Sequence, residues 1–66
     1  MENAKGRTRY IQRKGQGHLE TVDEFPANTK EERQEIRRCL EEYRMGDPSA
    51  HYYTSGRACK AWKEQQ

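Results

Sequence analysis

Four residues of this chain could bind a metal ion, and they are spread along it: His18, Cys39, His51 and Cys59. Their types match a Cys2His2 zinc site, but structural zinc sites usually take their ligands as close pairs such as C-x2-C. Here successive candidates are separated by 21, 12 and 8 positions, so there is no close pair. We therefore expect neither a metal site nor a cofactor.

Cys59 could also act as a nucleophile, because its neighbours Arg57 and Lys60 are basic and reactive cysteines are typically found beside cations. Catalysis further needs a base that a third group orients, and a pocket whose walls exclude water. The chain has only six Leu, Ile, Val and Phe residues to build such walls. We interpret Cys59 as a half-buried helix residue near Trp62, and expect no enzymatic activity and no small-molecule substrate.

The charges of the chain are distributed unevenly. Residues 1–17 carry a net charge of +4 and residues 48–66 one of +2, whereas residues 18–25 carry −3 and residues 26–47 carry −1. A strand near the C-terminal end that lies beside the first strand would bring the two basic segments together, with tyrosines among them. Basic side chains interleaved with aromatic ones on a sheet suit contacts with phosphates and stacking on bases. Against this interpretation, the total charge is only +2 and no nucleic-acid-binding signature is present.

Aromatic residues and arginines also anchor protein interfaces, so the same residues suit a protein partner. Such a partner could dock on an uncovered sheet face, on an edge strand, or as a second copy of the chain. Adjacent strand residues point to opposite faces, so one of Tyr52 and Tyr53 must face away from whatever the other packs on. The candidate interaction residues are Arg7, Arg9, Tyr10, Arg13, Tyr52, Tyr53, Arg57 and Trp62.

We expect a non-enzymatic binding module that contacts another protein, as an accessory or inhibitor-like factor, or that associates with itself. The alternative is a small nucleic-acid-binding protein that uses the basic hairpin and the sheet tyrosines. A simpler interpretation of the charges is that Arg7 and Arg9 pair across the hairpin with Asp23 or Glu24.

The element that must position these residues is one amphipathic helix over residues 28–46. Its apolar residues follow an i, i+3, i+4, i+7 spacing and form a single stripe: Ile36, Cys39, Leu40 and Tyr43. Asn28 or Thr29 can cap the first turn, with a glutamate three residues later, and Gly46 ends the helix.

Two β-prone runs, residues 7–13 and 18–25, flank the loop Lys14-Gly15-Gln16-Gly17, which predicts a hairpin. Residues 51–54 have the composition of a third strand, and residues 57–65 the spacing of a short terminal helix. We expect an α+β fold of ββαβ type with this extra helix. Its antiparallel sheet has strand order 2-1-3, with the main helix on one face and the other face left to water or a partner.

A pattern near the C-terminal end consists of Leu40-Glu41-Glu42-Tyr43-Arg44, then His51-Tyr52-Tyr53, then Ser55-Gly56-Arg57-Ala58-Cys59-Lys60-Ala61-Trp62. It resembles small uncharacterised bacterial and phage proteins, in which a helix ending in a Leu…Tyr-Arg stretch precedes a strand and a terminal Trp. The resemblance implies the same order of elements. That group has no assigned activity, so the resemblance implies no functional residue.

Length and hydropathy indicate the number of domains and the compartment of the protein. The chain of 66 residues is expected to form one small domain over residues 7–66, preceded by a flexible arm at residues 1–6. No apolar run could span a bilayer and no leader precedes the domain, so we expect a cytoplasmic protein without a membrane partner. Two cysteines fit reduced thiols, and a Cys39–Cys59 disulfide would require the final segment to fold back over the helix.

Overall fold

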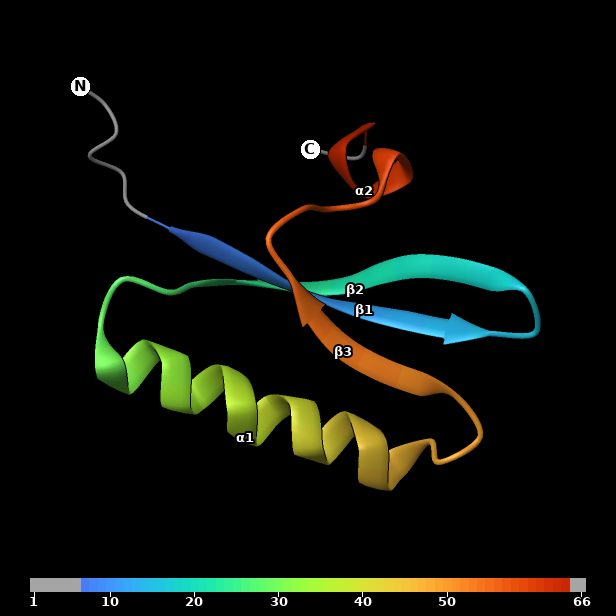
Figure 1. Cartoon of the computed structure of the whole chain (residues 1–66), viewed down its shortest axis with the longest axis horizontal. Coiled ribbons are helices and arrows are strands. Elements are labelled where there is room, and N and C mark those ends of the chain that lie inside the picture. The colour runs from blue at the N-terminus through green and yellow to red at the C-terminus, as the bar shows by residue number, and fades with distance from the viewer. Residues whose placement is uncertain (1–6, 65–66) are drawn as a thin grey trace.

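The computed structural model describes residues 7–64, which form two helices on opposite sides of one three-stranded sheet (Figure 1). The strands are β1 (Thr8–Gly15), β2 (His18–Pro26) and β3 (His51–Ser55), and the helices are α1 (Lys30–Gly46) and α2 (Lys60–Glu64). The strand order is β2-β1-β3 and both pairs are antiparallel, which confirms the predicted α+β fold. The arm expected at residues 1–6 lies outside the described residues.

A two-residue turn, Gln16-Gly17, joins β1 to β2. Both residues have positive φ, 56° for Gln16 and 75° for Gly17, as a type I′ hairpin turn requires. The strands therefore extend to Gly15 and from His18, and the loop is shorter than the four residues expected from the sequence.

A β-bulge interrupts the β1–β2 ladder. Ile11 lies opposite Asp23 and Gln12 lies opposite Thr21, so Val22 is the extra residue. In a regular strand Thr21 and Asp23 would point to the same face. Because of the bulge, Thr21 faces α2 and Asp23 faces α1.

The ends of α1 follow from its capping residues. Thr29 is the N-cap: its hydroxyl accepts from the N–H of Glu32 at 3.0 Å, and the Glu32 carboxylate accepts from the N–H of Thr29 at 3.2 Å and of Asn28 at 2.8 Å. This is a complete capping box. At the other end the N–H of Asp47 donates to the carbonyl of Tyr43 at 3.0 Å.

The core lies between α1 and the sheet. Ile11 is fully buried, Ile36 and Tyr52 are each 5% exposed, and the rest of the predicted helix stripe is half-buried. Tyr43 stacks on Tyr52 with ring centroids 5.3 Å apart. The predicted stripe is therefore confirmed as the side of α1 that packs on the sheet.

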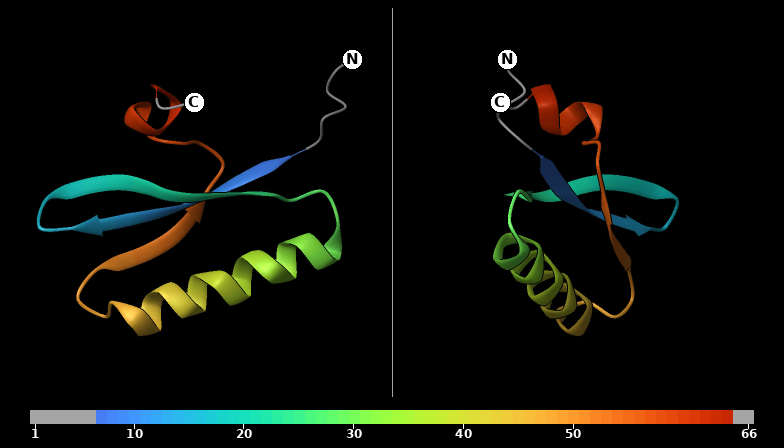
Figure 2. Two further views of the ribbon diagram at one scale, coloured as in Figure 1. Left: turned by 180° about the vertical axis from the view of Figure 1, so that it is seen from behind. Right: turned by 60° about the vertical axis from the view of Figure 1, so that its left-hand side comes forward.

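The second face of the sheet is less open than the sequence suggested, because α2 crosses it over β2 (Figure 2). A buried polar network attaches this segment: Thr21 donates to the Gln12 side chain and accepts from the Cys59 N–H at 2.8 Å. The Trp62 indole N–H donates to Glu24 at 2.9 Å. These polar contacts hold a helix of only five residues against the sheet.

The two cysteines, Cys39 on α1 and Cys59 before α2, are free thiols on opposite faces of the sheet. Neither described helix is long and apolar enough to cross a lipid bilayer.

Candidate functional site between α1 and β3

Charges of opposite sign occupy the two flanks of α1. Successive residues are about 100° apart around a helix axis, so four cations gather within about 60° of one another beside Leu40. We call this the basic flank: Lys30, Arg33, Arg37 and Arg44. The other side of the apolar stripe is the acidic flank: Glu31, Glu35 and Glu42.

The basic flank lies on the β3 side of the molecule. Arg44 donates through Nε and Nη2 to the backbone carbonyl of Tyr52, at 3.2 and 2.9 Å. Arg33 and Arg37 line a pocket of about 270 Å³ that opens between α1 and the β1–β3 strands. Its other lining residues are Arg9, Ile36, Leu40 and Thr54. We call this pocket the arginine groove.

Arg9 reaches the arginine groove from β1. It stands two residues before Ile11, so it faces α1, and it donates to the hydroxyl of Thr54 at 3.3 Å. Within residues 7–64, Arg9, Arg33 and Arg37 make no ion pair, and no carboxylate lines the groove. Three arginines thus line one groove together with the apolar residues Ile36 and Leu40.

The acidic flank lies on the β2 side, where the carboxylates have internal partners. Arg38 forms ion pairs with Glu35 and, at 3.2 Å, with Glu42. The Tyr43 hydroxyl donates to Asp23 at 3.0 Å, and burial together with this bond raises the pKa of Tyr43. Burial, and then the charge of Glu35, also raise the pKa of the Cys39 thiol.

Two of the predicted site residues, Arg13 and Tyr52, make structural contacts through their side chains, and Arg7 makes one through its backbone alone. The N–H of Arg7 donates to the side chain of Asn28, while Arg7 itself is exposed. Arg13 is neutralised by Glu20 at 3.4 Å and by Asp47 at 3.3 Å. Tyr52 is buried against α1.

Four other predicted residues lie on or near the face that α2 crosses: Tyr10, Tyr53, Arg57 and Trp62. Tyr53 stacks on His51 with centroids 5.4 Å apart, and Trp62 is half-buried against β2. The prediction that β3 lies beside β1 is confirmed. However, the strand alternation places Arg9 and Tyr53 on opposite faces, so β1 arginines and exposed tyrosines are not interleaved on one surface.

The sequence alone does not identify Arg33, Arg37, Leu40 or Thr54 as site residues, because it does not distinguish a helix charge that borders a groove from one that is solvated. A usable signal was present: Lys30, Arg33 and Arg37 recur at i, i+3 and i+7, which places them on one side of a helix. Nothing in the sequence shows that Arg9 joins them.

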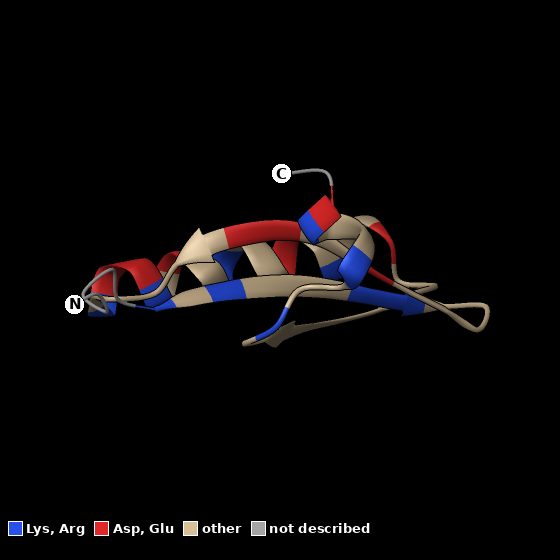
Figure 3. Cartoon of the chain, turned by 90° about the horizontal axis from the view of Figure 1, so that it is seen from above, with Lys and Arg blue, Asp and Glu red and all other residues tan. Residues whose placement is uncertain are grey.

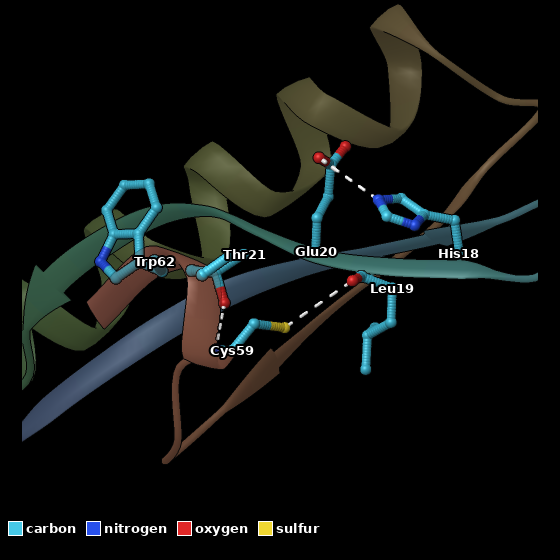
Figure 4. A pocket seen from close by; sticks show the side chains of 7 residues that line it. His18, Leu19, Glu20, Thr21, Cys59 and Trp62 are labelled. Atoms are coloured by element: carbon cyan, nitrogen blue, oxygen red, sulfur yellow. Dashed lines mark hydrogen bonds and ion pairs between the residues drawn. The ribbon is translucent and has the colours of Figure 1, made fainter. Parts of the chain in front are cut away.

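A second hollow of about 180 Å³ lies beside the C-terminal segment (Figure 4). The Cys59 thiol there accepts from the Gln12 amide at 3.7 Å and approaches the Leu19 carbonyl at 3.9 Å. His18 instead approaches Glu20 at 4.0 Å. Among residues 7–64, no three His, Cys, Asp or Glu side chains gather closely enough to hold a metal ion.

No protein-family model, curated protein or solved structure matches the chain.

Proposed function

We propose that the protein is a non-enzymatic binding module whose partner is another protein, and that the arginine groove receives an acidic part of that partner. The observation that carries the proposal is the convergence of Arg9, Arg33 and Arg37 with no carboxylate lining the groove. Like charges held together repel one another, so an anion placed among them is favoured. The guanidinium fork also matches the geometry of a carboxylate.

The floor of the groove favours a protein over a nucleic acid. Ile36 and Leu40 offer apolar contact, which a peptide side chain can use and a phosphate cannot. Single-stranded nucleic acids bind by stacking bases on aromatic rings as well as by phosphate contacts. Among residues 7–64, no aromatic side chain lines the groove. Tyr43 and Tyr52 are stacked on each other in the core, and Phe25, which lies opposite Arg9 on β2, is half-buried.

A nucleic acid remains the second candidate because of one feature on the other face. Lys14 lies opposite His51, whose ring stacks on Tyr53, so a cation stands next to a pair of rings. If this pair binds single strands, their affinity should fall steeply as salt is raised.

The proposal can be tested by affinity capture with two variants of equal charge. Arg33→Glu/Arg37→Glu reverses the groove, and the matched control Lys60→Glu/Lys63→Glu makes the same charge change on α2. Each protein is used as bait in extracts of the source cells with and without nuclease treatment, and a captured protein is then purified for direct titration. We expect wild type and control to bind it alike, and the groove variant to bind at least about tenfold more weakly, since interface arginines are frequent hot spots.

Equal binding by the groove variant and the control would overturn the assignment of the groove. Capture that disappears on nuclease treatment would favour the nucleic-acid candidate instead.

A further inference from the structure

The outer edge of β3 has a geometry that can be worked out from the hairpin. The two-residue turn closes on the Gly15–His18 pair, and hydrogen-bonded and non-hydrogen-bonded pairs then alternate along β1. Arg13 consequently directs its backbone groups toward β2 and away from β3. Its partner on β3, Tyr52, therefore directs its own N–H and C=O away from β1, toward the margin of the sheet.

Arg44 occupies that margin. Its guanidinium makes two hydrogen bonds to the outward carbonyl of Tyr52, at 2.9 and 3.2 Å. Two residues on, Thr54 also directs its backbone groups outward by the same alternation, and its side chain lines the arginine groove. Charged side chains on an edge strand are a common protection against unwanted strand pairing. Arg44 thus blocks the outer edge of β3, which is the sheet edge that borders the groove. We call Arg44 the guard of this edge.

We propose that the acidic part of the partner is an extended segment that adds to β3 as a fourth strand and displaces Arg44 from the Tyr52 carbonyl. This inference rests on the proposed function and specifies its mode. A backbone N–H of the segment donates to the Tyr52 carbonyl in place of Arg44. The released Arg44 guanidinium then pairs with a carboxylate of the segment. An acidic segment therefore compensates the displaced arginine, whereas a neutral segment does not.

The strand geometry also predicts the spacing of the acidic residues. On an added strand every second side chain points to the α1 side of the sheet, where Arg9, Arg33 and Arg37 converge. Carboxylates at alternate positions would all face these arginines. Pairing of β3 with the β3 of a second copy of the chain is unfavourable for two reasons. β3 has no acidic residue, and the pairing would bring two basic flanks together.

Fluorescence anisotropy with three labelled octapeptides tests this mode. One alternates Thr and Glu, one contains the same residues as a block of Thr followed by a block of Glu, and one alternates Thr and Gln. We expect the alternating Glu peptide to bind about tenfold more tightly than either of the others, because only it combines a strand with charge-assisted hydrogen bonds on one face.

The Arg44→Ala variant distinguishes a guard from an ordinary binding residue. It should weaken binding of the alternating Glu peptide and strengthen binding of the alternating Gln peptide, because the Tyr52 carbonyl is then free. Arg38→Ala, which removes an arginine from the acidic side, should leave the ratio of the two affinities unchanged. If Arg44→Ala fails to fold by circular dichroism, Arg44→Met provides the same test, because Met keeps a long aliphatic side chain and has no N–H that could donate to the Tyr52 carbonyl.

The outcomes separate this inference from the proposed function. Equal affinity of the alternating and block Glu peptides would overturn strand addition and leave a basic protein-binding groove. An unchanged affinity of Arg44→Ala for the neutral peptide would overturn the guard. A preference for oligothymidylate over both acidic peptides would overturn the groove as a protein site, and concentration-dependent self-association in sedimentation would favour a second copy.

Discussion

The charged residues on the β2 side of this molecule differ from those on the β3 side in the partners that they contact. Figure 3 shows acidic residues along β2 and basic residues along the neighbouring β1. On the β2 side, Glu35 and Glu42 pair with Arg38, and Asp23 and Glu24 accept hydrogen bonds from aromatic side chains. On the β3 side, the arginines contact a hydroxyl, a backbone carbonyl or the open groove. Among residues 7–64, the carboxylates of the β2 side have partners within the fold, whereas Arg9, Arg33 and Arg37 form no ion pair, and we propose that these arginines receive an external anion.

The orientation of α1 sharpens this difference. Its acidic flank lies beneath an acidic strand, since Glu42 and Asp23 line one hollow, and its basic flank lies beside Arg9. The reverse orientation would have placed opposite charges together. The fold therefore concentrates charge of each sign on one side, which creates a directional field that can steer a charged partner.

The largest effect on stability is expected from a substitution in the core, on which both sides of the molecule depend. Ile11 is fully buried in the core between α1 and the sheet, and Ile11→Ala should lower the free energy of unfolding by about 2–5 kcal/mol. A domain this small has little more than that, so the variant should be largely unfolded in circular dichroism. Leu19→Ala, at a residue that is 44% exposed, is the matched control and should change stability little. A folded, cooperative Ile11→Ala would mean that the two sides do not depend on one core.

A smaller effect is expected from a single internal partner on the β2 side. Tyr43→Phe removes the hydroxyl that donates to Asp23 and should lower the unfolding free energy by about 1 kcal/mol. Tyr53→Phe removes the same hydroxyl on the other face of the sheet, where it makes no hydrogen bond to a described residue. This variant should leave the unfolding free energy unchanged. Urea titrations measure both. Equal losses would show that the Tyr43 contact does not hold the β2 side together.

A pair of neighbouring arginines should respond in opposite directions. Arg38→Ala removes two ion pairs on the β2 side and should lower the urea midpoint. Arg37→Ala removes one of three convergent cations and should raise the midpoint slightly, because it relieves repulsion. Added salt should shrink both shifts. If both variants were equally destabilised, the charges of the two sides would not differ in their internal role.

Much of the fold was predictable because local sequence patterns determine it. The helix stripe, the capping residues and the two glycine-flanked strands follow periodicities that depend on neighbours in the sequence. The bulge at Val22 and the attachment of Cys59 to Thr21 depend on contacts between distant segments, and no local pattern encodes them. The expected open face was wrong in part for this reason.

The site was predictable only in half. Arg9 is selected from the basic hairpin, but the arginines of α1 that line the same groove are not, because a single sequence does not show which flank of a helix meets which strand. The tyrosines were grouped with the arginines by position along the chain. Alternation within the strands then separated Tyr53 from Arg9.

The smallest effect is expected at Asp47, which joins α1 to β3 and balances Arg13. Its carboxylate accepts from the Ser49 hydroxyl at 2.7 Å, the Tyr52 hydroxyl at 3.2 Å and Arg13 at 3.3 Å. These bonds, that of Ser49 most of all, lower the pKa of Asp47 below its ordinary value of 3.8. The stability that they supply is therefore complete above about pH 4 and is lost as pH falls through the depressed pKa of the folded state.

Asp47→Asn should consequently be less stable than wild type at neutral pH, and the difference should narrow below pH 4 as the wild-type carboxylate becomes protonated. Urea titrations at a series of pH values measure this difference, and Glu64→Gln, at an exposed residue of α2, is a control of the same kind. A constant difference across the acid range would show that Asp47 acts through the shape of its side chain and not through its charge. Among the described residues, Glu20 would then be the one carboxylate that balances Arg13, and the internal pairing of charges would not extend to the C-terminus of α1.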